Sequence, residues 1–274
     1  MVNALKPFPP AAHVLARLQS LLSDANSGMD DIAELIRLDS ALTARVIRIS
    51  NSILFRRGLP CSTIEEAVNR VGFREVYRVV AVLASDAIVA KQLPAYGREA
   101  IAMWRESVAC ACACEVLAER LGEDMPIAYM SGLLHATGRL PINNYLTSPA
   151  GAHQRLAEEP FPREHSGAEF ALFGFTQAAA GAFLLGKWNF TPTTIQPILH
   201  QYDPLAAEEP HDRMAAVLYA ARLLRTIVCQ NTSTKHLTID EEVFALVRLS
   251  LDDVLEHLQP VREQLARAEQ MTKA

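Results

Sequence analysis

Residues 29–52 read MDDIAELIRLDSALTARVIRISNS, and this stretch is the strongest indication of the fold. Apolar residues recur every three or four positions, first at Ile32 and Ile36 and then, after a polar break, from Leu42 onward. This spacing places the apolar side chains on one face of a helix. The break holds Asp39 and Ser40, residue types that cap helix N-termini. The stretch therefore predicts two consecutive amphipathic helices, with the second capped by Asp39-Ser40.

The same period of about 3.6 residues runs through almost every long segment of the chain, and no segment shows sustained alternation. Among the 274 residues only 12 are glycine and 7% are aromatic, and this balance favours helices over sheets. Ser62–Glu66 has the form of a capping box, and Gly72 is placed to end the short helix that follows. A last helix is predicted over 250–273. The sequence as a whole predicts an all-α fold.

The stretch Leu93–Gly97 reads LPAYG and is the clearest break in the first half, because proline and glycine both interrupt regular structure. We place a boundary there. This gives an N-terminal helical part over 1–94, a helical core over 95–229 and a C-terminal helical extension over 230–274.

The formal charge of −5 argues against binding nucleic acid through net charge alone. Residues 1–100 carry 12 Lys and Arg against 10 Asp and Glu, whereas residues 101–274 carry 14 against 21. Arginine is enriched at protein interfaces and suits acidic partners. The candidate surface for a protein partner is therefore the arginine-bearing N-terminal region, with Arg45, Arg48, Arg56, Arg57, Arg74 and Arg78.

The N-terminal residues do not resemble a signal peptide, since Lys6 and a proline-rich stretch stand where an apolar segment would lie. No run of ~18 uninterrupted apolar residues occurs, so we expect no membrane association. The odd number of cysteines, five, is typical of a reducing compartment. We therefore expect a cytoplasmic protein.

Several motifs that would indicate catalysis do not occur in the sequence: the phosphate-binding glycine loops, the nucleophile elbow and the HExxH zinc motif. Cys110, Cys112 and Cys114 form a close run, but on a helix Cys112 points largely away from the other two. Three thiolates cannot then converge on one metal. We interpret the run as small apolar packing, and its role stays open.

Several further stretches resemble the HDOD family, the HD-related output domains of bacterial signalling proteins. They are LKPFPP, the stretch quoted above with its extension ILFRRGLP, STIEEAVNRVGFREVYRVVAV, MWRESVACA, AYMSGLLHATGRL, ALFGFTQAAAGAFLLGKWNF and HQYDP. The resemblance covers roughly residues 5–225. It implies an N-terminal helical bundle packed on a helical subdomain similar to the HD phosphohydrolases.

HD phosphohydrolases bind one or two divalent metals through histidines and aspartates, and the metal activates water. Of those positions, only His135 keeps a matching residue here. The other positions hold Glu106, Ala136, Gln177, Gln201, Tyr202 and Ala221, and the lysine that usually follows the HD pair is Arg139. Glu106 could substitute as a ligand, but two groups do not make a catalytic metal site, which needs about three. His165 and His200 lie out of register and are expected at the surface.

The resemblance thus implies a non-catalytic signal-transduction module that acts by protein–protein interaction, with no cofactor and no bound metal. Two alternatives stay open. One is a residual metal-dependent phosphohydrolase at His135 and Glu106. The other is binding of nucleic acid or a cyclic dinucleotide by the arginine-bearing N-terminal region. The sequence does not identify the partner, the signal or the oligomeric state.

Overall fold

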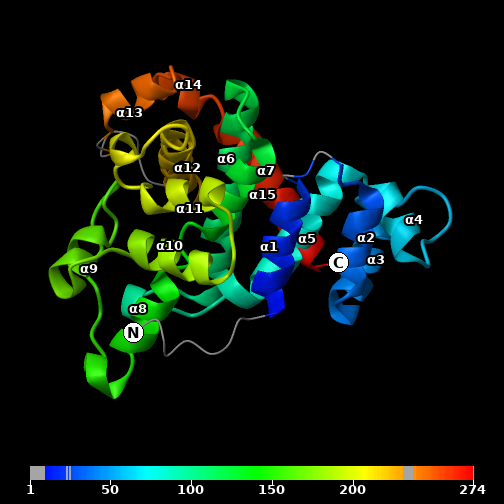
Figure 1. Ribbon diagram of the computed structural model, residues 1–274, viewed down its shortest axis with the longest axis horizontal. Coiled ribbons are helices and arrows are strands. Elements are labelled where there is room, and N and C mark those ends of the chain that lie inside the picture. The colour runs from blue at the N-terminus through cyan, green and yellow to red at the C-terminus, as the bar shows by residue number, and fades with distance from the viewer. Residues whose placement is uncertain (1–9, 23, 25, 231–236, 238, 274) are drawn as a thin grey trace. The chain divides into compact units, whose positions relative to one another are not determined.

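The computed structural model describes residues 10–22, 24, 26–230, 237 and 239–273 (Figure 1). These residues contain no β-strand, and the all-α prediction is confirmed. Most of the LKPFPP stretch lies outside the described residues. The helices are α1 (Pro10–Leu22), α2 (Met29–Arg37), α3 (Ser40–Ser50), α4 (Ile64–Val71), α5 (Phe73–Val89), α6 (Ala100–Leu121), α7 (Met125–Leu134), α8 (Arg139–Leu146), α9 (Ser166–Phe173), α10 (Gln177–Lys187), α11 (Pro192–Leu199), α12 (Asp212–Gln230), α13 (Glu241–Leu246), α14 (Leu251–Leu255) and α15 (Leu258–Lys273), with short 3₁₀ turns at Pro94–Tyr96, Pro149–Gly151 and Pro204–Ala206.

The chain forms two compact units. Among the described residues, one comprises those from Val89 to Leu265, and the other comprises those from Pro10 to Ile88 and from Ala266 to Lys273. We call them the core unit and the N-terminal unit. The division falls at 88/89, whereas the sequence places it at 94/95.

The stretch LPAYG belongs to the core unit because it is a buried turn. Leu93, Ala95 and Tyr96 are each at most 3% exposed. The Ala95 N–H donates to Asn143 Oδ1 at 3.0 Å, and the Ala95 carbonyl accepts from the Leu156 N–H at 2.8 Å. Proline and glycine therefore shape a packed turn here.

In the N-terminal unit the predicted helix starts are confirmed. The Asp39 side chain accepts hydrogen bonds from Ala41 N and Leu42 N, which caps α3. Thr63 and Glu66 form a reciprocal capping box at α4, and Gly72 follows α4 with a φ of 86°. Ile32, Ile36 and Val46 are completely buried, as expected for the apolar faces of α2 and α3.

In the core unit, α6, α7 and α12 pack together at the centre (Figure 1). Gly132 in α7 lies so close to α6 that a Cβ there would meet the Cys110 carbonyl oxygen at 2.6 Å. Cys110, Cys112 and Cys114 are free thiols, buried in α6. Small side chains at this contact let the two helix backbones approach each other closely.

The single helix predicted over 250–273 is wrong, because α14 and α15 are separated at Glu256 and His257. Pro260 lies in the first turn of α15. A proline ring clashes with the carbonyl of the residue four positions earlier, which is Glu256, and this clash accounts for the break between the two helices. Within the described residues no single helix is both long and apolar enough to cross a membrane, although α9 and α10, bent by 77°, reach that threshold as a pair.

Candidate functional site

A close contact between α8 and α10 brings the sequence-predicted site positions together in the core unit. Gly138 precedes α8, and a Cβ at this position would collide with the Gln177 carbonyl oxygen. Because glycine allows this approach, His135 and Arg139 lie next to the first turn of α10. His135, Arg139 and Gln177 are each at most 1% exposed.

Glu164 is the centre of this site, and three arginines surround it. Arg139 Nη2 lies 2.5 Å from Glu164 Oε2. Arg222 Nη2 and Arg225 Nη2 lie 2.7 and 2.6 Å from Oε1 of the same carboxylate. All three arginine residues are at most 1% exposed. A buried charge of this kind persists only when it is paired and hydrogen-bonded.

The backbone of Glu164 has a φ of 58°, in the left-handed region that residues other than glycine rarely adopt. Such a conformation costs on the order of 1 kcal/mol. The charge-assisted hydrogen bonds to the guanidinium groups are individually stronger than neutral ones and offset this cost.

Glu106, the candidate substitute ligand, also faces arginines. Its Oε2 lies 3.6 Å from Arg139 Nη1 and 3.6 Å from Arg225 Nη1. Its Oε1 lies 3.2 Å from Arg98 Nε. The carboxylate that could have held a metal ion therefore balances guanidinium charge.

His135 is oriented by its own helix. Its Nδ1 lies 2.7 Å from the Gly132 carbonyl oxygen. Since a carbonyl can only accept, Nδ1 carries a proton. The other ring nitrogen, Nε2, faces Arg225 Nη1 at 3.5 Å. The ring nitrogen that a metal would use is directed at a cation.

The amides at the other positions serve structural hydrogen bonds. Gln201 Nε2 donates to the His135 carbonyl at 2.9 Å, and Arg222 Nη1 donates to the Gln201 carbonyl at 2.5 Å. Gln177 Nε2 donates to Tyr202 Oη at 3.0 Å. The Arg222 guanidinium also lies 4.3 Å from the centre of the Tyr202 ring. These groups hold the loop after α11 against the arginine cluster.

The two alanine positions are apolar. Ala136 is 5% exposed and belongs to an apolar cluster that includes Tyr96, Met103 and Ala180. Ala221 is completely buried in α12, next to Arg222. Neither methyl group can bind a metal ion.

The electrostatics follow from burial and the three guanidinium charges. Burial raises the pKa of Glu164, but the charges of Arg225, Arg222 and Arg139 outweigh it and hold this pKa well below its usual range. Burial together with the Arg139 charge lowers the pKa of His165 to about 4. Burial raises the pKa of Tyr202 to about 12. Glu164 is therefore ionised, and His165 and Tyr202 are neutral, at neutral pH.

These residues do not fit a divalent metal. In the described part of the chain no three His, Cys, Asp or Glu side chains group in a way that could hold a metal ion. The carboxylates of Glu106 and Glu164 are already shared among guanidinium groups. A dication placed there would meet positive charge on several sides.

The sequence reasoning missed Glu164, Arg222 and Arg225. The sequence does carry a signal for Arg222 and Arg225, which are the two charged residues in the mostly apolar stretch LYAARLLRTIV. Because they are three positions apart, their side chains share one face of a helix. The expectation that His165 lies at the surface is wrong, since it is 2% exposed and packs edge-on against Tyr96. His200 is partly exposed.

The candidate surface arginines divide into two groups in the N-terminal unit. Arg45 pairs with Asp86 at 2.7 Å, and Arg78 pairs with Glu75 at 2.8 Å. The exposed members are Arg48, Arg56, Arg57 and Arg74.

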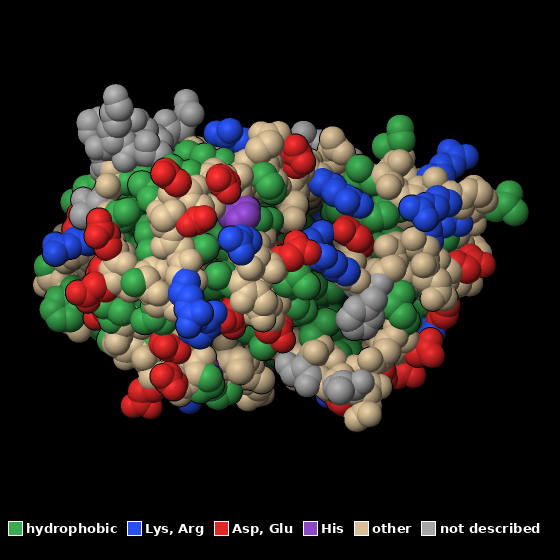
Figure 2. Space-filling model, turned by 90° about the horizontal axis from the view of Figure 1, so that it is seen from above, with side chains coloured by type: hydrophobic (Ala, Val, Ile, Leu, Met, Phe, Trp, Pro, Cys, Tyr) green, Lys and Arg blue, Asp and Glu red, His purple; other side chains and the backbone are tan. Residues whose placement is uncertain are grey.

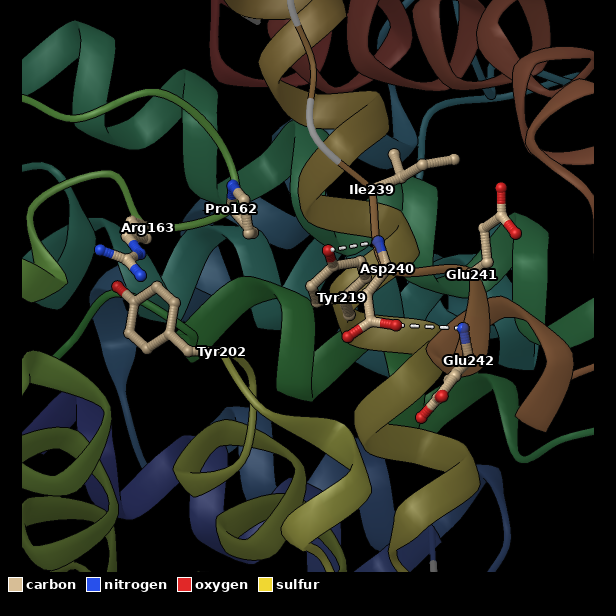
Figure 3. Close-up of a pocket in the computed structure, with 8 residues that line it drawn as sticks. All are labelled: Pro162, Arg163, Tyr202, Tyr219, Ile239, Asp240, Glu241 and Glu242. Atoms are coloured by element: carbon tan, nitrogen blue, oxygen red, sulfur yellow. Dashed lines mark hydrogen bonds between the residues drawn. The ribbon is translucent and has the colours of Figure 1, made fainter.

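A pocket of about 690 Å³ adjoins the site on the side of Tyr202 (Figure 3). Arg163 and Tyr202 line one wall, and Tyr219 and Asp240 line the other. The Asp240 N–H donates to Tyr219 Oη at 3.3 Å. Asp240 Oδ1 in turn caps α13 by accepting from Glu242 N. Asp240 on this wall is therefore already engaged in hydrogen bonds with its own surroundings.

The family model of the HDOD domain matches residues 8–204. The chain belongs to the HDOD family, and the resemblance seen in its motifs is confirmed. An uncharacterized protein of Treponema pallidum (strain Nichols) is 25% identical over 229 residues, which are 82% of this chain and 44% of that protein. The chain thus spans less than half the length of this curated relative.

Solved structures share the fold over nearly the whole chain. An HDOD domain protein of unknown function from Geobacter sulfurreducens has a TM-score of 0.72 at 21% identity, covering 98% of this chain and 95% of that one. A protein from Shewanella amazonensis SB2B, provisionally named a phosphohydrolase, has a TM-score of 0.68 at 24% identity, covering 98% and 96%. One from Marinobacter aquaeolei VT8, provisionally named a signal transduction protein, has a TM-score of 0.70 at 20% identity, covering 99% and 60%. At these identities the likeness defines the fold.

Proposed function

We propose that this chain is a non-catalytic signalling module that acts by binding another protein. The observation that carries the proposal is the buried Glu164, held by Arg139, Arg222 and Arg225 beside the positions where the resemblance to HD phosphohydrolases implies a metal site. A metal-activated water needs about three protein ligands and an open position. In this chain guanidinium groups surround Glu164 and Glu106, and their ion pairs engage the carboxylates that a metal would need as ligands.

Membership of the HDOD family is consistent with this proposal, whereas the names of its structural neighbours point in two directions. One neighbour is provisionally named for signal transduction and another for phosphohydrolase activity. For the present chain the buried arginines support the signalling proposal, because they supply positive charge where a metal would supply it.

The test is metal content combined with hydrolysis. The untagged full chain is incubated with manganese, iron or zinc, desalted and subjected to elemental analysis. It is then assayed with bis-p-nitrophenyl phosphate as the phosphodiester. We expect metal far below one equivalent per chain and no hydrolysis above the buffer rate.

One or two equivalents of metal, lost in His135→Ala together with hydrolysis, would establish the residual phosphohydrolase instead. His200→Ala is the matched control, since His200 lies outside the arginine cluster. Tight binding of a cyclic dinucleotide or duplex DNA, weakening steeply with salt, would favour the nucleic-acid alternative.

A further inference from the structure

The segment that joins α3 to α4, residues 51–61, forms a closed loop that we call the arginine loop. Its two ends are tied by the Asn51 side chain, which donates from Nδ2 to the Cys61 carbonyl at 2.8 Å and accepts from Cys61 N at 2.7 Å. Arg70 donates to Asn51 Oδ1 at 3.1 Å and to the Leu59 carbonyl. The loop is therefore held in one shape before any partner arrives.

The middle of the arginine loop is anchored as well. Phe55 is 8% exposed, and the Arg267 guanidinium lies 5.2 Å from the centre of its ring. The Arg56 N–H donates to the Ser52 carbonyl at 2.8 Å. An inward Phe55 fixes which neighbouring side chains point outward.

The outward side chains are aliphatic and basic. Ile53 is 97% exposed and Leu59 is 84% exposed. Arg56 and Arg57 are exposed, and no carboxylate in the described part of the chain pairs with either. At the right-hand end of Figure 2, Lys and Arg side chains lie beside protruding hydrophobic ones. A single exposed aliphatic residue is ordinary, but two on one preordered loop beside two unpaired arginines indicate a contact surface.

We propose that the arginine loop docks a protein segment that combines carboxylates with apolar side chains. This rests on the proposed protein-binding function and names the chemistry of the partner. Carboxylates would pair with the guanidinium groups of Arg56 and Arg57, and apolar side chains would cover Ile53 and Leu59. A phosphate backbone would satisfy the arginines but leave the two aliphatic groups in water, so the surface suits protein better than nucleic acid.

The test uses a displayed library of random 16-residue peptides selected on the full chain. We expect the recovered peptides to be enriched in Asp and Glu together with Leu, Ile or Phe. Binding of individual peptides is then measured by fluorescence anisotropy. Arg56→Glu/Arg57→Glu and, separately, Ile53→Ser/Leu59→Ser should each weaken it by at least about tenfold, as expected for residues central to an interface.

The matched control is Arg248→Glu/Arg262→Glu, which makes the same change in net charge at two exposed arginines outside the loop. Its peptide affinity should equal that of the wild type. All variants should keep the wild-type melting temperature, because the altered side chains are exposed.

Three results would overturn the proposal: selection that yields no binding peptide, recovered peptides without acidic enrichment, and peptides that bind the two loop variants as tightly as the wild type. Loop-dependent binding of a 20-base-pair duplex with a steep salt dependence, in place of peptide binding, would assign the loop to nucleic acid. These outcomes are independent of the metal analysis, so a failure of the docking proposal is distinguishable from a failure of the non-catalytic proposal.

Discussion

Arg225 Nη2 lies 2.6 Å from Glu164 Oε1, and both residues are almost completely removed from water. Arg139 and Arg222 share the same carboxylate, so one negative group holds three positive ones. Attraction within a low-dielectric interior is strong, but each charge has also lost its hydration. The stability of the core unit therefore depends on keeping this cluster complete.

The first prediction concerns the central carboxylate. Glu164→Gln leaves three buried guanidinium groups with too little negative charge, and removing one partner of a buried ion pair costs about 3–5 kcal/mol. Urea denaturation monitored by circular dichroism measures the loss. Glu158→Gln is the control, since that side chain is about half exposed and its pair with Arg98 contributes about 1 kcal/mol or less. Equal small effects in both variants would contradict the central role of Glu164.

A second prediction follows from the neutral His165, whose pKa is lowered from 6.5 to about 4 by burial and by the Arg139 charge. Between these two values the unfolded chain binds a proton at His165 that the folded chain does not. The free energy of unfolding should therefore fall as the pH falls from about 6.5 to about 4. Urea denaturation at several pH values measures this slope. His165→Gln should be flatter over that window, and an unchanged slope would show that another group is responsible.

The close approach of α8 and α10 gives a third prediction. A Cβ at Gly138 would collide with the Gln177 carbonyl oxygen and crowd Gly181 N. Gly138→Ala should destabilise the protein by about 1–3 kcal/mol, as overpacking typically does. In Gly186→Ala the nearest atom to the new Cβ is the flexible Ile195 Cδ1 at 3.9 Å. That control, inside α10, should be neutral or more stable because alanine favours a helix. Melting temperatures distinguish the two.

The fourth prediction concerns the thiols. Cys61, Cys110, Cys112 and Cys114 are buried, and burial raises the pKa of the partly exposed Cys229 to about 11. A buried or protonated thiol reacts slowly with disulfide reagents. With Ellman's reagent at neutral pH we expect little reaction in the native protein and five thiols in urea. Rapid reaction of one native thiol, abolished in Cys229→Ser, would show that Cys229 is accessible and ionised.

The helical character and most helix starts could be predicted from the sequence because they depend on local signals. Apolar spacing in α2 and α3, the Asp39 cap and the Thr63–Glu66 capping box all act within a few residues. The break between α14 and α15 was missed because the apolar period continues through it. Pro260 was the local signal for the break. Its ring clashes with the Glu256 carbonyl, and this interrupts the helix although the apolar spacing continues.

The candidate site could be predicted only in part. Motif comparison located Glu106, His135, Arg139, Gln177, Gln201 and Tyr202, and the structure places them around one cluster. It did not find Glu164, which lies in the irregular segment before α9 and reaches the cluster only through the tertiary fold. An ion pair between residues far apart in the chain, such as Glu164 and Arg222, follows no fixed spacing, so it cannot be recognised in a single sequence.

The turn at Leu93–Gly97 shows that proline and glycine content alone does not locate a domain boundary. Proline and glycine are common in linkers, but they also build tight turns. Burial of Ala95 and Tyr96 decides between these outcomes, and burial depends on distant partners such as Asn143 and Leu156.

The arginines that balance Glu164 are part of the polypeptide itself. A site built from carboxylates and imidazoles alone repels itself until an ion arrives, so its folding is linked to the supply of that ion. Here the counter-charge is synthesised with the chain and is present in every copy at a fixed stoichiometry. We therefore expect the folding of the core unit to be independent of trace-metal availability, in cells starved of metal as in cells that are replete.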